Sequence, residues 1–154
     1  MRGQNTISAQ SMSNTQFAFL RSESLPNRSA LQGWIDELGF DLQLCPDLDL
    51  KSDQGFSPCV LEGDSDVGPE LWPSTTAQAA DGDDGILEMA GARDFCVSMA
   101  WRGSMKDCAA VMIISCALAK YCDAVISYEG EAPEPFENLL AAAAEALNEA
   151  RKTR

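Results

Sequence analysis

The side chains that could take part in catalysis or binding are mainly carboxylates, and this chain concentrates them in one stretch. Of its 24 Asp and Glu residues, fifteen fall in the window from Asp36 to Asp94, where they face two bases, Lys51 and Arg93. The window therefore carries thirteen net negative charges, which equals the formal net charge of −13 for the whole sequence. Charge this uneven governs association with partners more than it governs the fold. It predicts repulsion from nucleic acid and from anionic membranes, and attraction to a basic protein.

The carboxylates do not form a recognisable catalytic or metal-binding motif. Pairs such as Asp64 and Asp66 could exchange protons, but no nucleophile, basic clamp or glycine-rich phosphate loop accompanies them. Histidine, the commonest general base and metal ligand, is absent. The segment 81–85, Asp-Gly-Asp-Asp-Gly, resembles a calcium loop, yet neither glycine places ligands at the EF-hand positions. We therefore predict a protein without catalytic residues, metal site or cofactor.

The six cysteines fit a structural role. None lies in a C-x-x-C pair, which argues against a zinc ribbon or a thioredoxin-type site. Their neighbours are mostly apolar, so we expect small core residues in a reducing cytoplasm, with a disulfide or a reactive thiol as the alternatives. The residues are Cys45, Cys59, Cys96, Cys108, Cys116 and Cys122.

The three tryptophans divide between core and surface. Trp34 shares the apolar face of a predicted helix, and Trp101 ends the bulky side of a predicted strand, so both are expected in the core. Trp72 lies between Glu70 and Pro73 at the start of a long acidic segment. An aromatic residue beside carboxylates suits an interface anchor, with local packing as the alternative.

Hydrophobic periodicity predicts alternating strands and helices. At residues 95–101 bulky residues alternate with Cys96, Ser98 and Ala100, which indicates a strand with one bulky and one small side. The expected strands are 17–21, 40–44, 56–62, a weaker 67–72, 95–101 and 124–128; the expected helices are 26–38, 105–122 and 136–152. Residues 73–91, rich in Ala, Asp and Gly, are expected to form a long acidic loop.

These elements predict an α+β fold: a single two-layer domain over residues 14–154, with a mixed sheet of about five strands and helices mainly on one face. Residues 1–13 are polar and unpatterned, and we expect a disordered N-terminal extension, with Met12 as a second candidate for the first residue. Neither a secretory signal nor an apolar run long enough for a membrane span is evident, so a cytoplasmic location is expected.

The acidic segments between predicted strands are the candidate partner-binding site. Carboxylates in loops on a rigid sheet would speed the capture of a basic partner, although acidity that serves solubility alone is the alternative. The candidate residues are Asp47, Asp49, Asp53, Glu62, Asp64, Asp66, Glu70, Trp72, Asp81, Asp83 and Asp84.

Three stretches of the sequence resemble small bacterial proteins of the toxin-immunity type. They are residues 25–44 (Leu-Pro-Asn-Arg-Ser-Ala-Leu-Gln-Gly-Trp-Ile-Asp-Glu-Leu-Gly-Phe-Asp-Leu-Gln-Leu), residues 55–63 (Gly-Phe-Ser-Pro-Cys-Val-Leu-Glu-Gly) and residues 101–130. The similarity is one of layout and covers most of the chain after Met12. It implies a non-enzymatic inhibitor, an immunity protein that occludes a cognate secreted toxin. The implied partner is a basic or cleft-bearing protein.

A second resemblance is to type III secretion chaperones, which are also small, acidic α+β proteins. Residues 30–44 would suit their first helix and strand. Such chaperones usually have two strands after the central helix, whereas the sequence predicts one, at 124–128. The chaperone role, in which an effector segment is bound, is the alternative function.

Overall fold

The structure, a computed structural model, describes residues 14–152. The predicted N-terminal extension, residues 1–13, lies outside the described residues. The first half comprises β1 (Asn14–Leu20), the 3-10 helix η1 (Ser22–Ser24), α2 (Arg28–Leu38), β2 (Leu42–Gln43), β3 (Gly55–Phe56), β4 (Cys59–Leu61), β5 (Asp64–Val67) and β6 (Glu70–Thr75). The second half comprises α3 (Thr76–Ala80), α4 (Asp84–Ala90), β7 (Phe95–Trp101), α5 (Met105–Tyr121), β8 (Val125–Tyr128) and α6 (Phe136–Lys152).

The strands form two sheets, and the α+β class expected from the sequence is confirmed. The larger sheet has the order β3-β6-β7-β1-β8, and the smaller one has the order β2-β4-β5. Every described pairing is antiparallel, so the expectation of a mixed sheet was wrong. One reason is that β2, which follows α2, joins the small sheet and does not pair with β1. The other is that β7 and β8, which run parallel and are joined through α5, are separated by the antiparallel β1.

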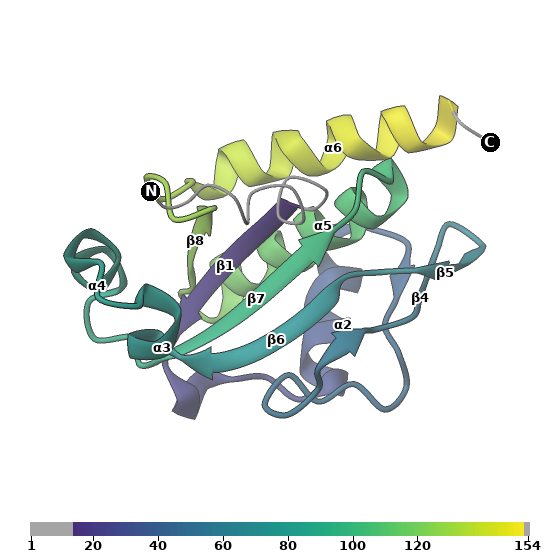
Figure 1. Cartoon of the computed structure of the whole chain (residues 1–154). Helices are drawn as coiled ribbons and strands as arrows, with labels where there is room; N and C mark the ends of the chain where they lie inside the picture. Colours follow the sequence, from purple (N-terminus) through teal and green to yellow (C-terminus); the bar gives the residue numbers. More distant parts are fainter. Residues whose placement is uncertain (1–13, 153–154) are drawn as a thin grey trace.

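Helices α2, α5 and α6 lie on one side of the large sheet, with α5 innermost (Figure 1). Helix α5 contacts α2, α6 and strands of both sheets, which explains why its sequence has no continuous polar side. Helix α6 lies across α5 and buries Leu139, Ala143, Ala146, Leu147 and Ala150. Within residues 14–152, no helix combines the length and apolar character that crossing a membrane requires.

Local signals explain where the main helices begin and end. Helix α2 begins after Asn27, whose side chain accepts a hydrogen bond from the Ala30 amide at 2.8 Å. It ends at Gly39, which adopts the left-handed conformation (φ 89°) that glycine tolerates best. Ser104 caps α5 by accepting from the Asp107 amide, in agreement with the capping signal in the sequence.

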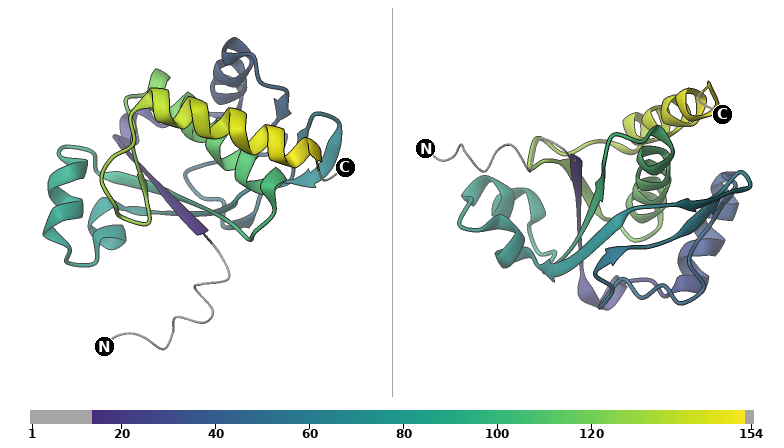
Figure 2. Two further views of the ribbon diagram at one scale, coloured as in Figure 1. Left: turned by 90° about the horizontal axis from the view of Figure 1, so that it is seen from above. Right: turned by 45° about the vertical axis from the view of Figure 1, so that its right-hand side comes forward.

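The long loop expected at residues 73–91 is not observed. Strand β6 continues to Thr75, and two short helices, α3 and α4, occupy most of the rest. Thr75 and Gln78 form a capping box at the start of α3, and Asp83 caps α4. Both helices pack on the side of the large sheet opposite α5, in a small core with Phe19 and Cys96 (Figure 2).

Two further strand predictions were too simple. The strand expected at 56–62 is divided at Pro58 into β3 and β4, which belong to different sheets. Proline donates no ladder hydrogen bond, so it suits the point at which the chain leaves one sheet for the other. The strand expected at 67–72 is likewise two strands, β5 and β6, separated by Gly68 and Pro69.

Candidate functional site

Within residues 14–152, the side of the large sheet that faces away from α5 is only partly covered, and it is the candidate site. Along β7, the small residues Cys96, Ser98 and Ala100 point to this side, while Val97 and Met99 enter the main core. The small side predicted from the sequence is therefore confirmed. Helices α3 and α4 cover its Cys96 end (Figure 2). The open face, as we name the remainder, consists of the exposed Phe56 and Trp72, the partly exposed Phe17, Glu70 and Ser98, and the buried Ala100. Phe17 also packs against the small core under α3 and α4.

The strand register arranges the open face in two rows. In one row Trp72 of β6 and Phe17 of β1 flank Ser98 of β7. In the other, Glu70 lies between Phe56 and Ala100. Trp72 is 47% exposed and Phe56 is 48% exposed. In most folded proteins, large aromatic side chains are more deeply buried than this. The small side chains of β7 are thus bordered by exposed rings, Trp72 and Phe56, on one side and by the partly buried Phe17 on the other.

Carboxylates lie at the edge of the open face that β3 forms. Asp47, Asp53 and Phe56 line one hollow of about 250 Å³, together with Cys45, Ser57 and Pro58. We call it the acidic hollow. Glu70 pairs with Arg102, whose Nε lies 3.1 Å from a Glu70 carboxylate oxygen. Exposed rings and carboxylates thus adjoin, an arrangement that suits guanidinium and ammonium groups.

Two of the predicted carboxylates tie the β4–β5 hairpin to the helices instead. Glu62 accepts a hydrogen bond from Arg151 Nε of α6 at 3.0 Å. A carboxylate oxygen of Asp64 lies 3.4 Å from Lys106 Nζ of α5. These interactions hold the hairpin against the helical layer, so Glu62 and Asp64 are parts of the scaffold.

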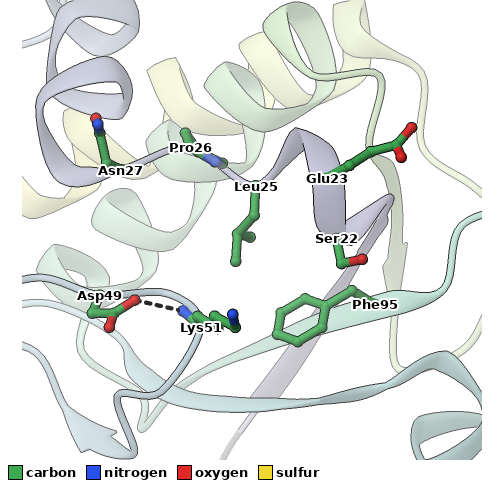
Figure 3. A pocket seen from close by; sticks show the side chains of 8 residues that line it. All are labelled: Ser22, Glu23, Leu25, Pro26, Asn27, Asp49, Lys51 and Phe95. Atoms are coloured by element: carbon green, nitrogen blue, oxygen red, sulfur yellow. Dashed lines mark hydrogen bonds between the residues drawn. The ribbon is translucent and has the colours of Figure 1, made fainter.

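Asp49 and Asp53 also shape the loop that precedes β3. Asp49 accepts from the Lys51 amide at 3.0 Å and from the Ser52 hydroxyl at 2.8 Å, and its own amide donates to Asp53 at 2.9 Å. Asp49 lies on a different hollow from Asp53, one of about 480 Å³ between η1 and this loop. Figure 3 shows Leu25, Phe95 and Lys51 directed into that hollow.

The acidic cluster at residues 81–84 lies far from the hairpin. Asp81 ends α3 in a left-handed conformation (φ 48°), and Asp83 accepts hydrogen bonds from the Gly85 and Ile86 amides. Asp84 is exposed in the first turn of α4, and Asp66 is exposed on the hairpin. Helices α3–α4 and the β4–β5 hairpin lie at opposite ends of the molecule (Figure 1). The eleven predicted residues therefore do not form one surface. Glu70 and Trp72 share one side of β6, and Asp47 and Asp53 line the hollow to which Phe56, the register partner of Glu70, also belongs.

The thiols are poorly suited to nucleophilic chemistry. Burial raises the pKa of Cys59, Cys96, Cys108 and Cys122 to about 11 and that of Cys116 to about 12. At neutral pH these groups are protonated, and the thiolate is the reactive form. Across residues 14–152, no group of three or more Cys, Asp or Glu side chains is placed to hold a metal ion.

Phe17 and Phe56 belong to the open face but were missing from the sequence-based site. The sequence did contain an indication of this face. The small residues on one side of the strand at 95–101 indicate that this side does not pack against a large hydrophobic core. What it lacked was the register that places Phe17 opposite Ser98. Trp34, expected in the core, is half-buried and stacks on Tyr121 with ring centroids 5.4 Å apart. Trp101 is buried, as expected.

Comparison of the chain with protein-family models, with curated proteins and with solved structures finds no match.

Proposed function

We propose that this chain is a non-enzymatic, protein-binding inhibitor of the immunity type, which neutralises a secreted toxin through the open face and the acidic hollow. The observation that carries the proposal is the exposure of Trp72 and Phe56 beside Glu70, Asp47 and Asp53. Large rings left in solvent on a rigid sheet are costly unless a partner covers them. Aromatic residues of this kind dominate the binding energy of protein interfaces.

Electrostatics supports a basic partner. The net charge of −13 attracts a cationic protein over a distance, and carboxylates beside the rings would pair with its Arg or Lys residues on contact. An anionic face of this kind could fill the cleft of a toxin that acts on nucleic acid, because such a cleft must be cationic. The proposal excludes nucleic acid and anionic membranes as partners on the same ground.

The proposed place of action is the cytoplasm. All six cysteines are free, and free buried thiols suit a reducing compartment. An inhibitor that acts by occlusion needs no reactive side chain. The buried, protonated thiols are compatible with that role.

The test needs a candidate toxin, for which the reading frame next to this gene is the first place to look, and then a direct binding measurement with its toxic domain. Co-expression should protect cells, and the purified proteins should associate more slowly as salt is raised. Trp72→Ala should weaken binding by about tenfold or more, because a central aromatic anchor contributes at least ~1.4 kcal/mol. Leu140→Ala is the matched control: Leu140 is an exposed apolar residue on α6, on the other side of the molecule, and its loss should leave affinity unchanged.

Two results would overturn the proposal. One is equal weakening by Trp72→Ala and Leu140→Ala, which would remove the open face from the interface. The other is a stable homodimer that binds an unfolded segment of an effector and no folded toxin domain. Light scattering and binding to each form of the partner would detect that chaperone behaviour.

A further inference from the structure

A third hollow lies on the helix-covered side of the large sheet, away from the open face. Its volume is about 230 Å³, and side chains from the sheet and from α5 and α6 line it. Those with polar or aromatic groups are Gln16, Trp101, Tyr128, Glu134 and Asn138. One water occupies about 30 Å³ of the liquid, so the hollow has the volume of roughly seven waters. A small organic molecule is of that size.

Two aromatic rings form one wall of this cavity. Trp101 and Tyr128 have ring centroids 6.1 Å apart, with an angle of 39° between the ring planes. The Tyr128 hydroxyl donates to Asn14 Oδ1 at 2.7 Å, which fixes the orientation of its ring. Tilted rings that share a cavity wall can both present π-electron density to a bound cation.

Of the lining residues that the structure describes, only Glu134 has a charged side chain, and Asn138 Nδ2 donates a hydrogen bond to its carboxylate at 3.4 Å. Gln16 is 1% exposed, and its amide nitrogen donates to Ser115 Oγ at 2.8 Å. Ser115 Oγ in turn donates to the Val111 carbonyl, so this nitrogen is held in place and the amide oxygen stays available as an acceptor. Glu134 contributes a half-buried carboxylate. Among the described lining residues there is no Lys or Arg.

The surroundings add further negative charge. Burial raises the pKa of Tyr128, and the nearby carboxylates of Glu129 and Glu131 raise it further. An anionic ligand would therefore be repelled here, and a neutral apolar ligand would leave the Gln16 oxygen and the Glu134 carboxylate without new partners.

We propose that this cavity binds a small organic cation of the alkylammonium class. The rings of Trp101 and Tyr128 contact the cationic alkyl groups, and Glu134 supplies the opposite charge. Aromatic rings that surround a substituted ammonium, with a carboxylate nearby, are the established chemistry for such ligands. The inference is independent of toxin binding, since none of its residues belongs to the open face.

The test uses choline as the probe and the full-length protein. Isothermal titration and tryptophan fluorescence should show saturable binding at one site. The neutral isostere, in which carbon replaces the nitrogen, should bind about tenfold more weakly, because it loses the ion pair and the cation–π attraction. Glu134→Gln should weaken choline binding about fivefold or more and should reduce the rise in Tm that a given choline concentration produces.

The control addresses the high negative charge of the protein, which attracts any cation. Glu137→Gln removes a carboxylate from the exposed first turn of α6 without touching the cavity lining. It should leave choline affinity unchanged. Equal losses in Glu134→Gln and Glu137→Gln, equal affinity for the neutral isostere, or no saturation would each overturn the proposal.

Discussion

Arg102 Nε lies 3.1 Å from a carboxylate oxygen of Glu70, at the end of the row that holds Phe56 and Ala100. The Arg102 side chain is 68% exposed and that of Glu70 is 25% exposed. The carboxylate nearest the exposed rings is thus already neutralised by an arginine of the same chain. A partner with an arginine at this position would replace Arg102, as one guanidinium can substitute for another.

This pair should contribute little to folding. A double-mutant cycle with Glu70→Gln and Arg102→Met, measured by urea unfolding, should give a coupling free energy of at most about 1 kcal/mol, as for other exposed ion pairs. Arg102→Met should in turn speed the capture of a basic toxin domain, because it frees the carboxylate. A coupling above ~2 kcal/mol would mean instead that the pair serves the fold.

Trp72 and Trp101 should respond very differently to truncation. Trp101 is 8% exposed and packs in the main core, so Trp101→Ala should lower the free energy of unfolding by about 3–5 kcal/mol. Trp72→Ala should lower it by less than ~1 kcal/mol, since half of the ring is in solvent. Chemical denaturation of both variants checks this. Similar losses in the two variants would show that Trp72 is needed for packing and would weaken its assignment to an interface.

Two glycines form a second matched pair. A Cβ atom on Gly68 would lie 2.1 Å from the carbonyl oxygen of Ser57, a backbone atom that cannot move aside. Gly68→Ala should therefore destabilise the protein by several kcal/mol, about as much as the most disruptive single substitutions. Gly33 is exposed within α2 and has nothing within 4 Å of its added Cβ, so Gly33→Ala should stabilise by about 0.5–1 kcal/mol. Thermal unfolding of the two variants should show Tm shifts of opposite sign.

Gly68 also illustrates what could not be predicted. In the sequence, Gly68-Pro69 argues against a strand, because both residues weaken a ladder. In the structure, the glycine allows the backbone of Ser57 to pass close by, where β5 and β6 belong to different sheets. Such a contact is made by residues eleven positions apart in sequence, and no periodicity reports it.

Long periodic segments were predicted well for a physical reason. Strand β7 and helix α6 agree residue for residue with the predicted ranges, and α5 differs by one residue at its end. Each repeats its pattern over several turns or pleats, so the signal is strong. Helices α3 and α4 have five and seven residues, too few for a repeat to emerge. Their caps, Thr75 with Gln78 and Asp83, were present in the sequence but resembled loop residues.

Only part of the candidate site was predicted. A sequence shows which residues are charged, but it does not show which of them pair with each other. Glu62 and Arg151 lie 89 positions apart, and only the fold shows that they interact. Trp72 could be assigned to the surface from its acidic neighbour Glu70. Phe17 could not, because no charged residue lies within three positions of it in the sequence and only the register places it opposite Ser98.

The buried thiols predict how stability depends on pH. An unfolded Cys ionises near its ordinary pKa of 9.0, whereas burial raises the pKa of Cys116 in the folded protein to about 12. Above pH 9 the unfolded chain therefore releases a proton that the folded chain retains, so stability falls as pH rises. Each such thiol contributes a loss of up to about 1.4 kcal/mol per pH unit between the two pKa values.

Cys116→Ala isolates this effect from the titration of Tyr and Lys residues. Urea unfolding at pH 9 and about one unit higher should show a smaller loss of stability in Cys116→Ala than in the original protein. Ser115→Ala is the control: Ser115 is also fully buried on α5 but does not titrate, so its variant should be less stable while keeping the original pH slope. If Cys116→Ala retains that slope as well, the Cys116 thiol ionises as readily in the folded chain as in the unfolded one, and its position would have to be accessible to water.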